Sequence, residues 1–298
     1  MGAIAPDIIM EEIMTYLKAM EKAAVLSDAL PYIQSFHGKI VVIKYGGNAM
    51  INEEINRSII NDVMLMHLVG IKPIIVHGGG PEISAMLKKL EIPTRFVNGQ
   101  RYTDENAMDV VQMVLIGRIN TNLVSRINKN GGNALGINGV DGNLLRCSQQ
   151  NPDLGFVGKV ESVNADFMQS VLDNKLLPVV SPIGMDAEGQ IYNINADYAA
   201  GKIAEAMQAE KMLLLTDVEG IYANPAEKKG IISELHCDEV PALIEKGIIA
   251  GGMIPKVQCC VSALNNGVKS THILDGRKPH SILLEIFTKE GIGTMVTK

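Results

Sequence analysis

Short apolar runs that alternate with helical patterns are the feature that most limits what this chain can fold into. The runs are rich in Ile and Val and end near glycine or proline, which is typical of buried strands; they cover residues 40–43, 74–76, 134–137 and 176–180. Helical patterns lie between them, as at 53–69 and 105–128. Alternation of this kind predicts a parallel sheet sandwiched between helices.

The alternation resumes after a turn at residues 185–189. A helix is expected from Asn195, and the later elements are a strand at 212–215, a helix at 254–265 and a strand at 271–274. We place a lobe boundary near 183–190, which divides the chain into a first lobe, 38–183, and a second lobe, 184–298.

Residues 1–37 precede the first strand and form a separate helical extension in this interpretation. Ile9, Ile13, Leu17 and Met20 recur near helical spacing, with charged residues between them. This spacing predicts an amphipathic helix, whose apolar face must be buried on its own subunit or on a neighbour.

Composition and charge exclude several classes of protein. The 298 residues are 47% hydrophobic, yet no apolar stretch has the length of a membrane span, and the first residues lack the pattern of a secretory signal. The four cysteines form no Cys-x-x-Cys pair, which favours reduced thiols in the cytoplasm over zinc or disulfides. A net charge of −6 gives no general attraction to nucleic acid or to a membrane surface. An anionic substrate must therefore be held by local groups.

Three glycine clusters are expected where strands end or helices begin; they are KYGGN (44–48), HGGGP (77–81) and GGMIPK (251–256). Backbone N–H groups beside a helix N-terminus suit an anion, although an ordinary tight turn explains any one cluster equally well. The pattern matches neither the P-loop nor the G-x-G-x-x-G dinucleotide fingerprint.

Two of these clusters carry a lysine, and a polar segment lies between them in the sequence. The lysines are Lys44 and Lys256, and the segment is YNINAD (192–197). From the residues alone, an exposed position on the surface is an equally good interpretation of both lysines. Either Asn195 or Asp197 is expected to cap the following helix. His77 is interpreted as a packed, structural histidine.

From about residue 39 onward, the chain resembles the amino-acid kinase family, and within it the branch that phosphorylates N-acetyl-L-glutamate. Six motifs carry the resemblance in order: VIKYGGNAM (42–50), IIVHGGGPEI (74–83), VNGQRYTDE (97–105), YNINAD (192–197), LLLTDVEGIY (213–222) and GGMIPK (251–256). The resemblance implies a doubly wound, mainly parallel αβα sandwich, with the substrate lobe first and the nucleotide lobe second.

The resemblance also implies an activity: ATP-dependent phosphorylation of the γ-carboxylate of N-acetyl-L-glutamate, a step of arginine biosynthesis in the cytoplasm. Lys44 and Lys256 would contact the transferring phosphoryl group, and Asp197 would orient both. The implied substrate-binding residues are Gly79, Gly80, Arg101 and Asn193. The implied nucleotide-binding residues are Gly46, Gly47, Thr216, Asp217, Gly220, Ile221 and Met253. Mg²⁺ would arrive with ATP, and no protein side chain is expected to bind it.

The residue types suit this chemistry. A γ-carboxylate in water ordinarily has a pKa of about 4.3 and is already ionised at neutral pH, so no general base is needed. The lysines would offset the repulsion between this anion and the polyphosphate. Arg101 suits bidentate binding of a carboxylate, although without the resemblance an ion pair with Asp104 or Glu105 is preferred. Two alternatives remain: a family member that acts on aspartate, glutamate or carbamate, and a non-catalytic amino-acid-binding regulator.

Members of the family that arginine inhibits have a leading helix that joins dimers into a hexamer, a trimer of dimers. The resemblance therefore implies an arginine site; its residues would be Tyr16, Lys202, His280, Glu285 and Gly291. From the sequence alone, Glu285 is equally an exposed carboxylate at a strand end. A nitrogen-regulatory signalling protein is a further implied partner.

Overall fold

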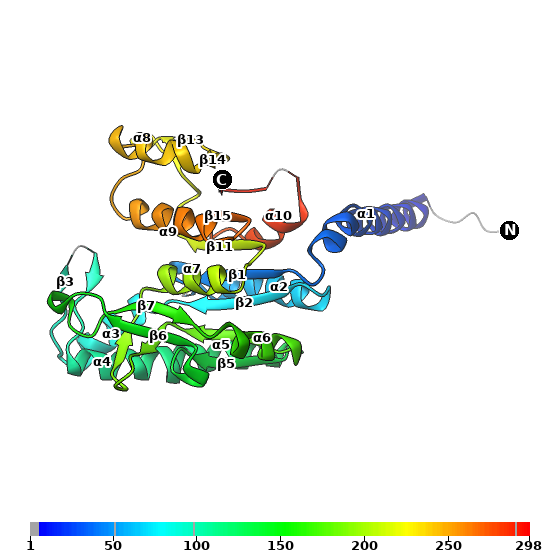
Figure 1. The fold of residues 1–298 in the computed structure, drawn as a ribbon. Helices are drawn as coiled ribbons and strands as arrows, with labels where there is room; N and C mark the ends of the chain where they lie inside the picture. The colour runs from blue at the N-terminus through cyan, green and yellow to red at the C-terminus, as the bar shows by residue number, and fades with distance from the viewer. Residues whose placement is uncertain (1–5, 51, 98, 290) are drawn as a thin grey trace.

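One eight-stranded sheet forms the centre of the molecule in the computed structural model (Figure 1). Its strand order is β14-β16-β15-β11-β1-β2-β8-β5, and every neighbouring pair is parallel except β15 and β16. The structure describes residues 6–50, 52–97, 99–289 and 291–298, and the side chains of 6–15, 18, 19, 48 and 49 lie outside the description. The predicted αβα architecture with a mainly parallel sheet is confirmed.

All six predicted strands are present, with ends that shift by one or two residues. The strands of the central sheet are β1 (Ile40–Tyr45), β2 (Lys72–His77), β5 (Ala134–Asn138), β8 (Leu177–Ser181), β11 (Lys211–Thr216), β14 (Glu234–His236), β15 (Ser270–Asp275) and β16 (Thr294–Thr297). The side chains of β1 are buried on both faces of the sheet, because helices cover both faces. This explains why the strand is a continuous apolar run and does not alternate.

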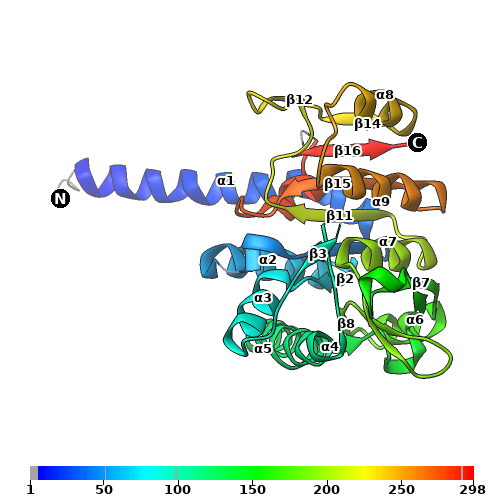
Figure 2. The same ribbon diagram turned by 90° about the vertical axis from the view of Figure 1, so that its left-hand side faces the viewer.

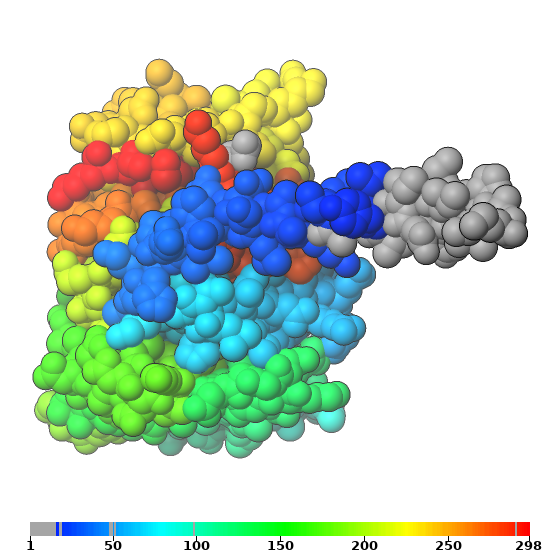
Figure 3. Space-filling model, turned by 90° about the vertical axis from the view of Figure 1, so that its right-hand side faces the viewer, coloured from blue at the N-terminus to red at the C-terminus, as the bar shows by residue number. Residues whose placement is uncertain are grey.

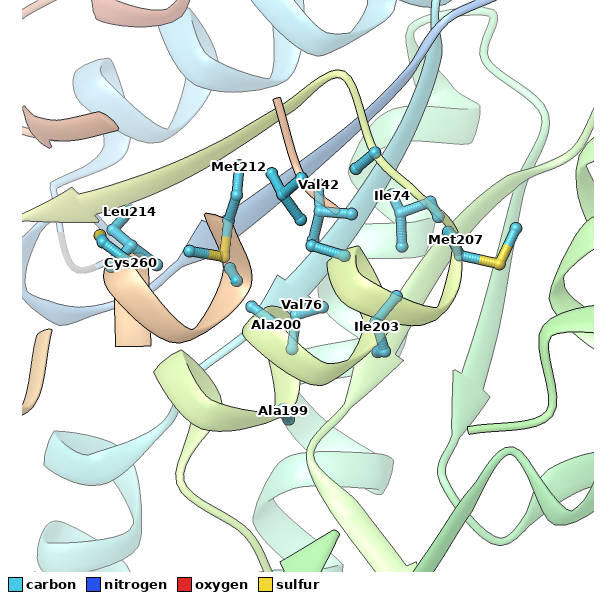
Figure 4. Packing of buried hydrophobic residues seen from close by; sticks show 14 of the residues in the cluster. Val42, Ile74, Val76, Ala199, Ala200, Ile203, Met207, Met212, Leu214 and Cys260 are labelled. Carbon is cyan, nitrogen blue, oxygen red and sulfur yellow. The ribbon is translucent and has the colours of Figure 1, made fainter. Parts of the chain in front are cut away.

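Helices pack on both faces of the sheet. Those longer than one turn are α1 (Pro6–Phe36), α2 (Glu53–Leu68), α3 (Gly80–Lys89), α4 (Glu105–Gln112), α5 (Thr121–Lys129), α6 (Ala165–Asp173), α7 (Ala196–Ala206), α8 (Val240–Glu245), α9 (Met253–Asn265) and α10 (Ser281–Phe287). On one face, Ala200 and Ile203 of α7 pack against Val42, Ile74 and Val76 of the sheet (Figure 4). On the other face, α2, α4, α5 and α10 contribute to a second apolar cluster.

The helix predicted over 105–128 is not uniform. Between α4 and α5, residues Met113–Asn120 form a π-helix. The apolar spacing of a sequence does not reveal such a change in hydrogen-bond pattern, because the flanking turns keep their helical period. π-helical segments are often found at functional sites.

One smaller sheet and two hairpins accompany the central sheet. A four-stranded sheet contains β6 (Leu145–Gln149), β7 (Gly158–Val163), β9 (Ile183–Met185) and β10 (Ile191–Asn193). Two hairpins are formed by β3 (Phe96–Val97) with β4 (Gln100–Arg101), and by β12 (Tyr222–Asn224) with β13 (Lys229–Ile231). The central sheet is continuous across the predicted lobe boundary, because β1 pairs with both β2 and β11. The division into two lobes stays a prediction.

The N-terminal extension is a single helix of 31 residues, α1, which confirms the predicted helix. It extends away from the body of the molecule (Figures 2 and 3), and its C-terminal part contacts α10. Tyr16 is 65% exposed, and Leu17 and Met20 are also exposed. The side chains of Ile9 and Ile13 lie outside the described residues, so the predicted amphipathic face stays a prediction. Within the described ranges, no helix combines the length and the apolar character that crossing a membrane requires.

Candidate active site

Two lysines and an aspartate meet where β1 ends and where α7 and α9 begin. Lys44 Nζ lies 3.1 Å from Asp197 Oδ1, and Lys256 Nζ lies 2.5 Å from Asp197 Oδ2. All three side chains are largely buried, with exposed fractions of 12%, 15% and 22% for Lys44, Asp197 and Lys256. The alternative that the two lysines are solvated surface residues is therefore wrong.

The two ammonium groups determine the charge state of Asp197. Burial alone would raise the pKa of this carboxyl, but the nearby charges of Lys44 and Lys256 outweigh that effect and lower the pKa to about 2. Asp197 is thus ionised at any physiological pH. The site holds two positive charges and one negative charge, and its net charge attracts an anion.

Asn195, not Asp197, caps α7. Its side-chain Oδ1 accepts hydrogen bonds from the backbone N–H groups of Asp197 (2.9 Å) and Tyr198 (3.2 Å). This cap leaves both carboxylate oxygens of Asp197 for the lysines. The sequence left the choice between Asn195 and Asp197 open, and the structure decides it.

The HGGGP cluster forms the turn between β2 and α3, with Pro81 in the first turn of the helix. A Cβ atom on Gly79 would lie 2.6 Å or less from side-chain atoms of Leu115 and Ile119, both in the π-helical segment. A Cβ atom on Gly80 would meet nothing within 4 Å. The π-helix therefore packs closely against the turn at Gly79.

Arg101, in β4, is 8% exposed and turns inward. Its guanidinium donates hydrogen bonds to Thr94 Oγ1 (2.7 Å), Ser84 Oγ (2.7 Å) and Gly80 O (3.0 Å). The alternative prediction, an ion pair between Arg101 and Asp104 or Glu105, is wrong. Asp104 instead caps α4, because its Oδ1 accepts a hydrogen bond from Ala107 N. Among the described side chains, no carboxylate pairs with Arg101, so its buried charge is available to an anion.

These groups line one cavity of about 230 Å³. Seven predicted site residues border it: Lys44, Gly47, Gly79, Gly80, Arg101, Asn193 and Asp197. One part of the wall is apolar; the residues that form it are Ile83, Phe96, Leu115, Val157 and Pro182. The sequence analysis assigned none of these apolar residues to the site, although Ile83 ends the motif at 74–83, because their residue types do not differ from those of core residues.

A family model described as the amino acid kinase family matches residues 39–275. The chain belongs to the amino acid kinase family. Its sequence is 52% identical over 291 residues to a protein named acetylglutamate kinase in Moorella thermoacetica, which covers 94% of this chain and 98% of that protein. It is also 51% identical over 294 residues to an acetylglutamate kinase of Heliobacterium modesticaldum, covering 95% of this chain and all of that protein.

Solved structures show the same amino acid kinase fold. The N-acetylglutamate synthase of Neisseria gonorrhoeae, in complex with coenzyme A and N-acetyl-glutamate, has a TM-score of 0.82 at 24% identity; it covers 93% of this chain, which spans 63% of the length of the synthase chain. The same synthase with coenzyme A and L-arginine has a TM-score of 0.79 at 23% identity, covering 93% and 65%. Carbamate kinase from Giardia lamblia bound to AMP-PNP has a TM-score of 0.64 at 18% identity, covering 88% and 99%.

The predicted nucleotide-binding residues of this amino acid kinase lie at the same edge of the sheet. Thr216 ends β11 and Met253 begins α9. A Cβ atom on Gly47 would lie 3.0 Å from Asp217 Oδ2, so the first glycine turn adjoins the loop after β11. Ile221 has a buried side chain, and its N–H donates to Thr294 Oγ1 at 2.8 Å, so its role at the nucleotide stays a prediction.

A second cavity, of about 330 Å³, lies between the end of α1 and α10. Glu285 and Gly291 both line it, and Glu285 Oε2 accepts a hydrogen bond from Ile292 N at 3.0 Å. Glu285 lies in α10 and not at a strand end, and its side chain is buried. Its Oε1 lies 2.8 Å from His272 Nδ1 and 3.6 Å from Lys211 Nζ.

Three predicted members of this second site lie elsewhere. Lys202 pairs with Glu205 along α7, and His280 pairs with Asp62 of α2. Tyr16 lies on the projecting part of α1, and it is Tyr32, sixteen residues further along, that lines the cavity. At ~1.5 Å per residue the two tyrosines are separated by about 24 Å along the helix. The assignment of Tyr16, Lys202 and His280 to an arginine site stays a prediction.

Family membership implies ATP with a divalent metal. Within the described residues, no group of three or more His, Cys, Asp or Glu side chains is placed to hold a metal ion. Both oxygens of Asp197 contact ammonium groups, so this carboxylate is a poor metal ligand as it stands.

Proposed function

We propose that this chain transfers the γ-phosphoryl group of ATP to the γ-carboxylate of N-acetyl-L-glutamate and forms N-acetyl-L-glutamyl 5-phosphate. One observation carries the proposal: a single cavity joins the Lys44–Asp197 pair to the buried guanidinium of Arg101, which has no carboxylate partner among the described residues. Such a cavity suits an acceptor with two carboxylates, one bound and one reacting. Relatives of about 52% identity are named acetylglutamate kinase, which supports the choice of acceptor.

Each residue then has a defined task. Arg101 binds the α-carboxylate, and Asn193 lies beside the reacting end of the acceptor. Lys44 and Lys256 stabilise the charge that spreads over the transferring phosphoryl oxygens, and Asp197 holds the two lysines in place before the reaction. The acceptor carboxylate is ionised at neutral pH, so no side chain must remove a proton. Mg²⁺ enters as part of the Mg·ATP substrate and neutralises phosphate charge.

The acceptor can be tested directly. N-acetylglutamate, glutamate, aspartate and carbamate are supplied separately with ATP, and hydroxylamine converts any acyl phosphate into a hydroxamate. We expect ATP consumption and hydroxamate only with N-acetylglutamate. Turnover with another acceptor would identify that compound as the substrate in place of N-acetylglutamate. No turnover with any of them would favour a non-catalytic binding role.

We further propose that arginine regulates the enzyme by binding in the second cavity. There, the carboxylate of Glu285 would bind the guanidinium of arginine, while Lys211 and backbone groups near Gly291 would bind its polar end. The cavity supports this assignment, because Glu285, Lys211 and Gly291 all line it and Glu285 and Lys211 bring opposite charges to it. A synthase of the same fold has been solved with L-arginine.

The proposed assembly is a hexamer in the cytoplasm, formed as a trimer of dimers through α1. Exposed apolar side chains on the projecting helix support it; among them are Leu17, Met20, Val25, Leu26 and Leu30. Inhibition requires that arginine bind two arrangements of the lobes with different affinity. We also propose a nitrogen-regulatory signalling protein as a partner that would act on this assembly.

A further inference from the structure

His77, at the end of β2, is completely buried beside the glycine turn. Burial lowers its pKa to about 4, so the ring is neutral at physiological pH. Its Nδ1 lies 2.9 Å from Gly78 O. A carbonyl oxygen only accepts hydrogen bonds, so the proton of the neutral ring is on Nδ1, and Nε2 is left as an acceptor.

The acceptor Nε2 has a donor within reach. Ser181 Oγ lies 3.0 Å from it and 3.3 Å from Leu115 O. A hydroxyl has one hydrogen to donate, and the shorter contact directs it to His77. Ser181 ends β8, the neighbour of β2 in the sheet, so this bond joins two strand ends beneath the glycine turn.

Asn120 completes the network from the last residue of the π-helical segment. Its Nδ2 donates to Val179 O at 2.8 Å and to Ser181 Oγ at 3.1 Å, which fixes the orientation of the amide. A Cβ atom on Gly136 would lie 2.1 Å from Asn120 Oδ1, so the glycine of β5 provides the space for this side chain. The donors therefore run in one direction, from Asn120 to Ser181 to His77 to Gly78 O.

We propose that this chain of hydrogen bonds locks the peptide between Gly78 and Gly79 so that the N–H of Gly79 points into the active-site cavity. The described chain contains no cis peptide, and in a trans peptide the C=O and the following N–H point in opposite directions. His77 holds Gly78 O toward the protein interior, so Gly79 N–H faces away from it, toward the cavity that Gly78, Gly79 and Gly80 line.

The same turn is also held on its other side. Gly78 N donates to Tyr45 O at 2.7 Å, so the backbone of Gly78 is bound through both its N–H and its C=O. A glycine peptide would otherwise rotate easily, since glycine lacks the Cβ that restricts other residues. His77 is thus a positioning residue: it contacts no substrate, and it acts by keeping a backbone donor in place for the anion. The inference rests on the proposed phosphoryl transfer.

Two substitutions of His77 separate the lock from simple packing. The amide nitrogen of asparagine reaches about the position of Nδ1, whereas that of glutamine reaches about the position of Nε2. His77→Asn therefore keeps the donor to Gly78 O, and His77→Gln loses it while keeping the contact to Ser181. We expect His77→Gln to lower kcat by about 100-fold, as for the loss of one preorganised donor, with KM for ATP little changed. We expect His77→Asn to stay within about tenfold of the unchanged protein.

Asn120 provides a second test that does not alter the turn itself. We expect Asn120→Ala to lower kcat in the same way as His77→Gln, though less, because Ser181 and His77 transmit the effect. The matched control is Asn122→Ala, on an exposed position two residues further along, and it should leave kcat unchanged. The thermal midpoint and the affinity for ADP are measured for every variant, so that unfolded protein is not taken for a lost donor.

A spectroscopic measurement keeps this inference separate from the proposed function. In protein labelled with ¹⁵N-glycine, inorganic phosphate should shift the Gly79 amide resonance in the unchanged protein and in His77→Asn, and not in His77→Gln. If the unchanged protein phosphorylates none of the acceptors, the proposed function fails while this shift still reports the lock. Equal kcat and equal Gly79 shifts in His77→Gln and His77→Asn would overturn the lock.

Discussion

Lys256 Nζ lies 2.5 Å from Asp197 Oδ2, although 59 residues separate the two in the sequence. The contact joins the first turn of α9 to the first turn of α7. The other carboxylate oxygen of Asp197 contacts Lys44 at the end of β1. One buried carboxylate therefore fixes two ammonium groups from two different parts of the fold. Such fixed charges stabilise a transition state without reorganisation at the moment of reaction.

The lysine pair gives the first prediction. Lys44→Ala and Lys256→Ala should each lower kcat by about 100- to 1,000-fold, with a much smaller rise in either KM, because these contacts strengthen as charge develops. Steady-state kinetics with both substrates measures this. Lys246→Ala, on an exposed position, is the matched control. Full activity in either active-site variant would show that the substituted lysine takes no part in catalysis.

Arg101→Lys should raise KM for N-acetylglutamate and leave KM for ATP nearly unchanged. A lysine keeps the charge, but a single ammonium cannot reproduce the planar fork that now donates to Ser84, Thr94 and Gly80 O. The two KM values are measured in one set of rates at varied concentrations. A rise confined to KM for ATP would instead assign Arg101 to the nucleotide.

The sheet could be predicted from the sequence because its signals are local, whereas the two active-site lysines were assigned by the family resemblance. The buried strands are continuous apolar runs, and the lysines stand inside glycine clusters that end strands or begin helices. The second cavity could not be predicted in detail. Lys211 and His272 meet Glu285 only because β11 and β15 are neighbours in the sheet, and no spacing in the sequence encodes that pairing.

The π-helical segment and the role of Asn120 were missed for a related reason. Asn120 looks like an ordinary polar residue within a helical pattern, and only the tertiary structure shows that it is buried against Val179 and Ser181. Arg101 was assigned by resemblance alone; local charge favoured Asp104, which caps α4 instead.

Asp62 predicts a pH dependence of stability. Its buried carboxyl has a pKa raised to about 6, chiefly by burial, while His280 opposes the rise. Because the folded pKa lies above the unfolded value of 3.8, the stabilising contribution is fully present below about pH 4 and is lost as the pH rises through 6. Between those pH values the free energy of unfolding should fall by on the order of 2 kcal/mol in the unchanged protein, and Asp62→Asn should abolish this fall.

Urea unfolding of both proteins between pH 4 and 7 measures this difference. Asp109→Asn, which changes an exposed carboxylate on α4, is the control and should keep the slope of the unchanged protein. An identical slope in Asp62→Asn would show that Asp62 does not titrate in this range.

Truncation of α1 tests the proposed assembly. A chain that starts at about Phe36 should remain an active kinase, fall from hexamer to dimer, and lose most of its sensitivity to arginine. Light scattering and a titration of the rate with arginine measure the two properties. Because that truncation also removes Tyr32 from the second cavity, a chain that starts at Ala23 is the sharper test. It keeps Tyr32 and loses the exposed Tyr16, Leu17 and Met20.

Glu285→Gln separates the effector site from the assembly. This variant should remain hexameric and active while its inhibition by arginine weakens by about tenfold or more, since a neutral amide cannot pair with a guanidinium. An unchanged protein that is dimeric and indifferent to millimolar arginine would contradict both parts of the regulatory proposal.

The most direct test of the central claim follows the oxygen atoms of the acceptor. N-acetylglutamate with ¹⁸O in its γ-carboxylate is incubated with Mg·ATP and the enzyme, and hydroxylamine then attacks the acyl carbon of the product and releases phosphate. If the γ-carboxylate attacks the γ-phosphorus, each released phosphate carries one ¹⁸O, which ³¹P NMR detects as a shifted resonance. Released phosphate without ¹⁸O would mean that water accepts the phosphoryl group, and would contradict the proposed reaction.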